Sequence, residues 1–192
     1  MVQKTSNNKK SMWRVGIKIL IVVFMLSFVS CEEQDRKNLA ESYLPLEIGN
    51  YWKLENTEKR EILNKTFISD KEYYIVKYMK DTFYYRIEDN KVFVKNMNSE
   101  NIIFDFNAKE KSSWNFDYIT VSLINKKDTI VINHKQYTNC YHFLFDIPEM
   151  ADDEFSIWLA PDIGFIQEEC EECELQIKKL QTARLNNIIY YY

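Results

Sequence analysis

The sequence predicts a mainly β protein, with a single antiparallel sheet of roughly 9–11 short strands, curved or partly closed into a barrel- or clam-like shape. Three observations carry this prediction. The 192 residues include 13 Tyr and 12 Phe but only three Gly and three Pro, and aromatic side chains favour pleated, half-buried surfaces. Short runs of alternating polar and apolar residues recur between polar breaks. Beyond the first thirty residues, no stretch of twelve or more residues holds a helical apolar stripe.

The first thirty residues have the layout of a secretory signal. They hold five basic residues and no acidic one, and an apolar run from Ile19 to Val29 follows the basic part. The run is shorter than the roughly 20 residues that a membrane-spanning helix needs. Ser30 directly precedes Cys31, and this ending resembles the lipobox of bacterial lipoproteins. The resemblance implies cleavage before Cys31 and acyl chains (palmitate among them) that attach the protein to a membrane; the alternative is an uncleaved signal anchor.

The chain then divides into a signal peptide (1–30), a lipidated tether (31–42) and a single β-rich domain (43–192). The acidic residues just after Cys31 resemble the surface-export signals of Bacteroidota lipoproteins. The expected location is therefore the outer membrane, at its periplasmic face or at the cell surface. From Cys31 onward, 20 basic residues stand against 29 acidic ones, a net charge of −9. This charge argues against nucleic acid as a partner.

Alternation places the strands in order along the domain. Pro45 and Gly49-Asn50 suit a turn, after which the first strand begins near Tyr51. Later strands are expected at 73–79, 83–88, 91–95, 101–106, 118–125, 129–133, 136–147, 154–160, 164–169 and 174–185. Asp89-Asn90 is predicted to form a tight hairpin turn, and Lys126-Lys127-Asp128 a second one. The tail 188–192 is expected to add an edge strand or to pack as a plug.

Both ends of this domain resemble a group of uncharacterised Bacteroidota lipoproteins. Residues 45–52 follow the pattern PL-x-x-GN-x-W, and residues 158–164 follow W-x-AP-x-(V/I)-G. Asp162 stands where a glycine is usual in the group. These motifs are short and structural, so the resemblance implies a compartment and a fold but no activity.

Three cysteines remain besides Cys31. In an oxidising compartment, one disulfide and one free thiol is the simplest arrangement. Cys170 and Cys173 are the candidate disulfide, and pairing of Cys140 with either one is the alternative. A redox-active C-x-x-C should precede a helix, whereas this one lies between two expected strands. A zinc site needs two further ligands, for which Cys140 and His142, two apart on one strand, are the candidates.

The strands expected at 73–79 and 83–88 carry neighbouring aromatic residues, which place one ring on each face of the sheet. One face must belong to the core. The other is predicted to present Tyr74, Tyr78 and Tyr84 as a stacking platform for a glycan or a protein partner. The alternative is that both faces are partly covered in a closed barrel.

No catalytic set is recognisable in the sequence. His142 has the pattern of a hydrogen-bonded strand histidine, no serine sits in a nucleophile elbow, and no glycine-rich loop suits a phosphate. We therefore expect no enzyme activity, no cofactor and no metal. The predicted function is that of a noncatalytic, membrane-anchored envelope lipoprotein that binds a ligand or an unknown protein or glycan partner. The alternatives are a structural accessory subunit of an envelope assembly and an enzyme.

Overall fold

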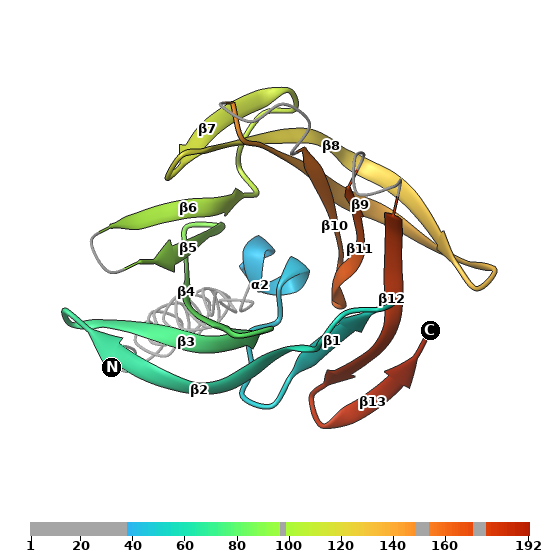
Figure 1. The fold of residues 1–192 in the computed structure, drawn as a ribbon, viewed down its shortest axis with the longest axis horizontal. Coiled ribbons are helices and arrows are strands. Elements are labelled where there is room, and N and C mark those ends of the chain that lie inside the picture. The colour runs from blue at the N-terminus through green and yellow to red at the C-terminus, as the bar shows by residue number, and fades with distance from the viewer. Residues whose placement is uncertain (1–37, 97–98, 149–153, 171–175) are drawn as a thin grey trace, which may run out of the picture. The chain divides into compact units, whose positions relative to one another are not determined.

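The computed structural model describes residues 38–96, 99–148, 154–170 and 176–192. These residues form one folded unit, in which antiparallel strands curve into a nearly closed barrel (Figure 1). The prediction of a mainly β fold with one partly closed antiparallel sheet is confirmed. The described residues form thirteen strands instead of roughly 9–11.

Twelve strands follow one another around the barrel in the order β6-β5-β4-β3-β2-β1-β12-β11-β10-β9-β8-β7, and β13 pairs with β12. Their bounds are β1 Tyr51–Leu54, β2 Arg60–Ile68, β3 Lys71–Tyr78, β4 Asp81–Glu88, β5 Lys91–Lys95, β6 Glu100–Asp105, β7 Ser112–Phe116, β8 Ile119–Ile132, β9 Lys135–Asp146, β10 Phe155–Ala160, β11 Gly164–Cys170, β12 Gln176–Leu185 and β13 Ile188–Tyr191. The sequence patterns did not mark β2 or β7. In β2, the register shifts between Ile62 and Asn64, and this bulge interrupts the two-residue period.

The barrel has one seam, between β6 and β7. Within the described residues, β6 pairs only with β5 and β7 only with β8. A side-chain hydrogen bond crosses this seam: the indole N–H of Trp114 on β7 donates to the carbonyl of Ile102 on β6 at 2.9 Å. Aromatic side chains fill the interior, and Phe104, Phe143, Phe145 and Phe165 are almost completely buried.

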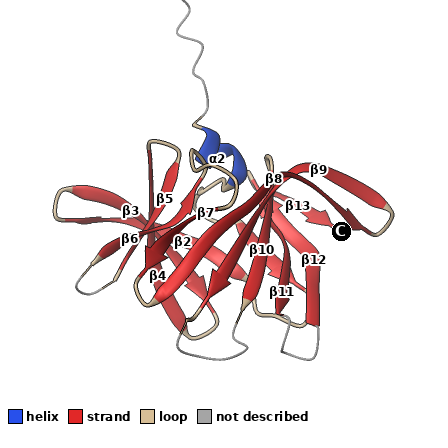
Figure 2. Cartoon of the chain, turned by 90° about the horizontal axis from the view of Figure 1, so that it is seen from above, coloured by secondary structure: helices blue, strands red, loops and turns tan. Residues whose placement is uncertain are grey.

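A short helix closes one end of the barrel. Helix α2, Leu39–Tyr43, lies at that end (Figure 2) and its Ala40 is fully buried. The Tyr43 ring stacks on Phe106 at a centroid distance of 5.3 Å, and its hydroxyl donates to the carbonyl of Asn139 at 2.7 Å. The prediction of a tether through residue 42 is therefore wrong for residues 38–42. Five residues are too few for an apolar stripe, so the sequence pattern did not reveal this helix.

The prediction of a second hairpin turn at residues 126–128 is wrong. Lys126-Lys127-Asp128 lies inside β8, which runs without a turn from Ile119 to Ile132. Irregularities between Asn125 and Ile130 carry the strand past these polar residues while β8 stays paired with β9. The hairpin turn comes later, at Asn133-His134, where both residues have positive φ angles of 46° and 68°. Asp89-Asn90 forms the predicted turn between β4 and β5, with φ angles of 51° and 58°.

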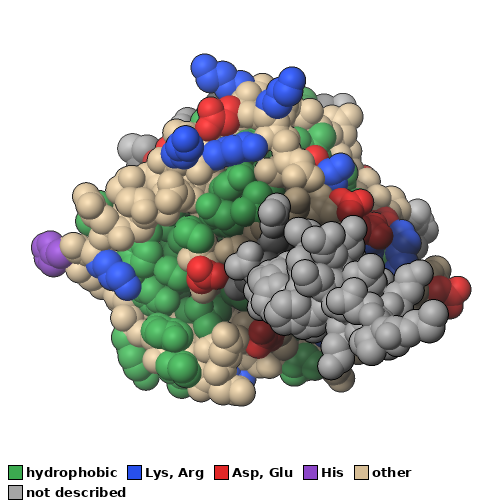
Figure 3. All heavy atoms as spheres, turned by 180° about the vertical axis from the view of Figure 1, so that it is seen from behind, with side chains coloured by type: hydrophobic (Ala, Val, Ile, Leu, Met, Phe, Trp, Pro, Cys, Tyr) green, Lys and Arg blue, Asp and Glu red, His purple; other side chains and the backbone are tan. Residues whose placement is uncertain are grey.

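The C-terminal strand is exposed. Strand β13 pairs with β12, as the edge-strand alternative predicted, and all four of its residues are exposed. Tyr191 is the most open of them, at 80% exposure. Hydrophobic side chains gather in Figure 3 on the side of the molecule where β13 lies. In the described part of the chain, no helix has both the length and the apolar character needed to cross a membrane.

Candidate ligand-binding cavity

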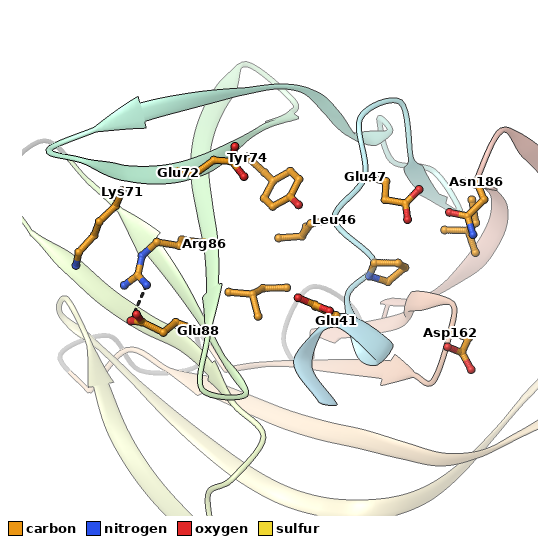
Figure 4. Close-up of a pocket in the computed structure, with 13 residues that line it drawn as sticks. Glu41, Leu46, Glu47, Lys71, Glu72, Tyr74, Arg86, Glu88, Asp162 and Asn186 are labelled. Carbon is orange, nitrogen blue, oxygen red and sulfur yellow. Dashed lines mark hydrogen bonds and ion pairs between the residues drawn. The ribbon is translucent and has the colours of Figure 1, made fainter. Parts of the chain in front are cut away.

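Besides a hollow of about 500 Å³ beside β13, two hollows in the barrel domain are candidate sites. One is a depression of about 660 Å³ beside α2, and the other is a smaller cavity of about 230 Å³ inside the barrel. The depression is lined by charged side chains of α2, of the loop that follows α2, and of β3 and β4 (Figure 4). The cavity is lined mainly by apolar side chains of the strand interiors. The two hollows therefore suit different ligands.

The two basic residues that line the depression, Arg86 and Lys71, are already paired with carboxylates. Arg86 donates to Glu88 at 2.7 Å, shown as a dashed line in Figure 4, and to Glu100 at 2.9 Å. Glu100 also accepts from Lys71 at 2.8 Å and from the Tyr73 hydroxyl at 2.5 Å. Burial alone would raise the pKa of Glu100, but these hydrogen bonds hold it at about 2. Because Arg86, Lys71 and Glu100 are already paired, we interpret this network as a structural cluster.

The inner cavity is built by almost the whole sheet. Ten strands, β2 to β11, contribute side chains to it. Its apolar lining residues are Phe83, Val94, Ile103, Phe104, Phe116, Ile119, Phe145, Phe155, Ile157 and Phe165. The four polar ones, Arg60, Tyr78, Tyr85 and Glu168, lie on β2, β3, β4 and β11. A mostly apolar pocket with a few converging polar groups is the usual character of a small-molecule site.

Arg60 is the central polar residue of this cavity. It is the first residue of β2 and pairs with Trp52 on β1, whose side chain is also buried. Its guanidinium carbon lies over two rings, 4.2 Å from the centroid of Tyr78 and 3.9 Å from that of Phe165. Nη2 donates to Glu168 at 3.0 Å. The side chain is only 9% exposed.

One nitrogen of Arg60 is left without a partner. Among the described residues, Nη1 is the buried side-chain polar atom that makes no hydrogen bond. Burial alone would lower the pKa of Arg60, but Glu168 and the neighbouring tyrosines raise it above its ordinary value, so the group stays charged. A buried donor without an acceptor costs about 1–3 kcal/mol.

The two tyrosines beside Arg60 each carry a hydroxyl that is able to donate a hydrogen bond. Burial raises the pKa of Tyr85 above its ordinary value, and burial also raises that of Tyr78. Both phenols therefore keep their protons at neutral pH. Within the described residues, neither hydroxyl makes a hydrogen bond. The wall formed by β2, β3, β4 and β11 thus presents three donor-bearing residues and the carboxylate of Glu168.

The predicted tyrosine platform is divided by the sheet register. Tyr74 pairs with Tyr85, whereas Tyr84 pairs with Ile75, so Tyr84 faces the opposite side of the sheet. Tyr74 and Tyr78 share the inner face, but Tyr74 lines the depression and Tyr78 lines the cavity. A platform of Tyr74, Tyr78 and Tyr84 is therefore wrong, because the sequence alone does not show which residues of β3 and β4 stand opposite one another.

The cysteines separate into three cases. Cys170, at the end of β11, is disulfide-bonded. Cys31 and Cys173 lie outside the described residues. Lipidation at Cys31 and the pairing of Cys170 with Cys173 therefore stay predictions. Cys140 is free and fully buried, which rules out its alternative pairing. Burial raises the pKa of its thiol to about 11, so the thiol is protonated and unreactive at neutral pH. A Cys₃His zinc set is not assembled, since Cys170 is already in a disulfide.

A polar cluster that the sequence did not reveal lies on β8, β9 and β10. His142 Nε2 is 2.9 Å from Ser156 Oγ, and its Nδ1 is 3.4 Å from Asp128 Oδ2. Trp158 stacks on the His142 ring and donates to Asp128 at 2.9 Å. The arrangement of Ser156, His142 and Asp128 resembles a catalytic Ser-His-Asp set. None of these four residues lines the depression or the inner cavity.

Comparison with known proteins adds no relative to these observations: no family model, no curated protein and no solved structure matches the chain. The candidate site therefore depends on the geometry of this barrel alone.

Proposed function

We propose that this protein is a noncatalytic envelope lipoprotein that binds a small, largely apolar ligand inside its barrel. The observation that carries the proposal is a mainly apolar cavity inside the barrel whose four polar lining residues are Arg60, Tyr78, Tyr85 and Glu168. An apolar pocket with a few converging polar groups favours small-molecule binding over a purely structural interior.

The membrane attachment is the second part of this proposal and is supported by the N-terminal sequence. The basic start, the short apolar run and the Ser30-Cys31 ending favour export and lipidation at Cys31. Metabolic labelling with palmitate tests it: the label should be present in the parent protein and absent from the Cys31→Ala variant. Labelling that survives this substitution would contradict the assignment.

The location is tested by protease treatment of intact cells, with a periplasmic protein as a control. Loss of the domain while the control survives would place it on the cell surface. Survival of both would place it on the periplasmic side, and the acidic residues after Cys31 would lose their proposed role in surface export.

Ligand binding is tested with ethylbenzene and the mature protein in lipid nanodiscs, by saturation-transfer NMR against empty nanodiscs. Ile103 lines the cavity, whereas Ile75 lies on the outer face opposite Tyr84. We expect binding by the parent protein and by the Ile75→Trp variant, and its loss in the Ile103→Trp variant. Equal signals from the two variants would show that the cavity is not the binding site.

A second candidate function, as an accessory subunit of an envelope assembly, is favoured by the exposure of β13. Ile189 and Tyr191 are 47% and 80% exposed on an edge strand that can pair with a further strand. Co-purification of a membrane protein that is lost on replacing both residues by Arg would support this function. Co-purification unchanged by these replacements would argue against β13 as the contact.

A further inference from the structure

We propose that the free edge of β13 accepts an extended peptide segment of a partner protein, which adds a strand beside β13. This inference goes beyond the inner cavity and rests on the second candidate function, because it states the chemistry by which an accessory subunit would hold its partner. Three features carry it: the unpaired backbone groups of β13, an unfilled strand position between β13 and β9, and the hollow of about 500 Å³ beside β13.

Two residues of β13 direct their backbone groups away from the sheet. Tyr192 donates its N–H to the carbonyl of Gln181 at 3.0 Å, so these two residues form a hydrogen-bonded pair. Such pairs alternate with non-hydrogen-bonded ones along an antiparallel ladder, and the register of β12 and β13 has no shift. The N–H and C=O groups of Ile189 and Tyr191 therefore point to the free edge. Only another peptide backbone offers donors and acceptors at the spacing of this edge.

The strand position next to this edge is unfilled. β12 pairs with β1 on one side and, on the other, first with β11 and then, from Thr182 onward, with β13. β13 thus continues the position of β11. The next position belongs to β10, but β10 ends at Ala160 and pairs with β9 only from Tyr141 onward. In the described part of the chain, the first half of β9 therefore has no neighbour on the side of β13, although β13 lies beside the β8–β9 hairpin (Figure 1, Figure 2).

The hollow beside β13 supplies room for the side chains of an added strand. Its walls come from the β8–β9 hairpin, the β10–β11 turn and the β12–β13 hairpin with the residue that follows, and four of its eleven lining residues are tyrosines. The rings of Tyr137 and Tyr192, from opposite walls, lie 6.1 Å apart. Because alternate side chains of a strand point to one face, apolar or aromatic residues at every second position of the partner segment suit this hollow.

The charges in the hollow favour an acidic residue in the partner segment. Lys135 lines the hollow, and its Nζ lies 5.0 Å from the centre of the Tyr137 ring. No carboxylate of the described residues pairs with Lys135. Asp162, the other charged lining residue, accepts a hydrogen bond from the Ser42 hydroxyl at 3.4 Å. A carboxylate of the added strand would pair with Lys135.

Random peptides of ten residues displayed on phage are the probe. They are selected on the mature protein in lipid nanodiscs, after removal of peptides that bind empty nanodiscs. We expect the selected peptides to share alternating apolar residues and an acidic residue. Methylation of alternate backbone nitrogens of a selected peptide should weaken binding about tenfold in the phase whose N–H groups face β13. Selection of no peptide, or tolerance of methylation in both phases, would overturn the inference.

Matched variants place the bound peptide on β13. Ile189→Pro removes an N–H that faces the free edge and leaves the bonds to β12 in place, whereas Ile189→Thr keeps the N–H. We expect a loss of about tenfold in affinity for Ile189→Pro and of less than about twofold for Ile189→Thr. Lys135→Gln should weaken binding about threefold, and Lys127→Gln, at an exposed residue of β8 outside the hollow, should not change it. Equal affinities of the two Ile189 variants would contradict strand addition. Because the methylated peptides are tested on the parent protein, the inference stays testable if Ile189→Pro does not fold.

Two further measurements separate this inference from other occupants and from the accessory function. A dimer of the detergent-solubilised parent protein that is lost in Ile189→Pro, measured by sedimentation, would replace the peptide by a second copy of the chain. If no peptide binds but co-purification of a membrane protein depends on Ile189 and Tyr191, the accessory function stands and the inference fails. If no peptide binds and co-purification does not depend on these residues, both fail.

Discussion

The two ends of the barrel are built differently from the same sheet. At the α2 end, Tyr43 and Phe106 pack against each other, and the hydroxyl of Tyr43 is satisfied by a backbone carbonyl. At the cavity end, Arg60 keeps an unsatisfied nitrogen and the lining leaves about 230 Å³ empty. One end is therefore closely packed, whereas the other leaves space and a buried polar atom unsatisfied, and both of these features reduce stability.

The largest expected effect comes from making the same substitution at both ends. Phe106→Ala removes a ring that is 1% exposed and contacts Tyr43 and Tyr141, so we expect a loss of about 3–5 kcal/mol in the free energy of unfolding. Phe83→Ala removes a half-buried ring beside an existing hollow and should cost less than about 2 kcal/mol. Urea unfolding followed by tryptophan fluorescence measures both. Equal losses in the free energy of unfolding would show that the two ends of the barrel are packed equally well.

A glycine near α2 gives the next largest effect. Gly164 has a φ of +97°, and a Cβ there would lie 2.6 Å from the indole nitrogen of Trp52, which itself donates to the carbonyl of Ile163. Gly164→Ala should therefore cost about 2–3 kcal/mol. Gly49→Ala is the matched control, since its φ is +89° but its Cβ would meet only the flexible end of Arg184, at 2.8 Å. Its loss should be smaller in the same thermal or urea measurement.

The charged cluster at the depression gives a pH-dependent effect. The folded pKa of Glu100, about 2, lies below its ordinary value of 4.5, so its contribution is present above about pH 4.5 and is lost as the pH falls towards 2. Glu100→Gln should flatten the stability profile in this window by about 1–2 kcal/mol, after allowance for solvent screening. Glu88→Gln is the control and should change the profile little, because the Glu88 side chain is 58% exposed. A profile unchanged by Glu100→Gln would contradict the assignment.

The smallest effect is expected at a hairpin tip that belongs to neither end. His134 is exposed and has a φ of 68° beside Asn133, whose φ is 46°. Because Asn-Gly is the preferred dipeptide for such a turn, His134→Gly should raise the free energy of unfolding by about 0.5 kcal/mol. The small change expected for this variant is the reference with which the larger changes in the free energy of unfolding are compared. A decrease would show that His134 makes contacts that offset its backbone conformation.

The strands were largely predictable, and their errors have identifiable causes. The alternating run around Phe83 and Tyr85 and the turn at Asp89-Asn90 appear where the sequence placed them. The predicted hairpin at 126–128 failed because polar residues can also occupy a bulge in a continuous strand. Ala40 was missed because one buried turn of helix carries too few residues to show a period.

The candidate site was not predictable, because none of its polar members has a recognisable sequence context. Arg60 stands in a charged stretch next to Lys59 and Glu61, which reads as a solvated surface. Its partner Glu168 is 108 residues away. Tyr78 was predicted as part of a binding surface and lines the cavity. Its grouping with Tyr84 was wrong, since the register that separates Tyr74 from Tyr84 depends on two strands.

The mainly β class, the antiparallel hairpins and the expectation of an exported, lipid-anchored chain could be predicted, because they follow from local composition, alternation and turn residues. The near closure of the sheet, the helix α2 at one end and the burial of Arg60 with one nitrogen unpaired could not be predicted. Closure brings together residues from ten strands, and pairings over such distances depend on strand order and register rather than on any local pattern.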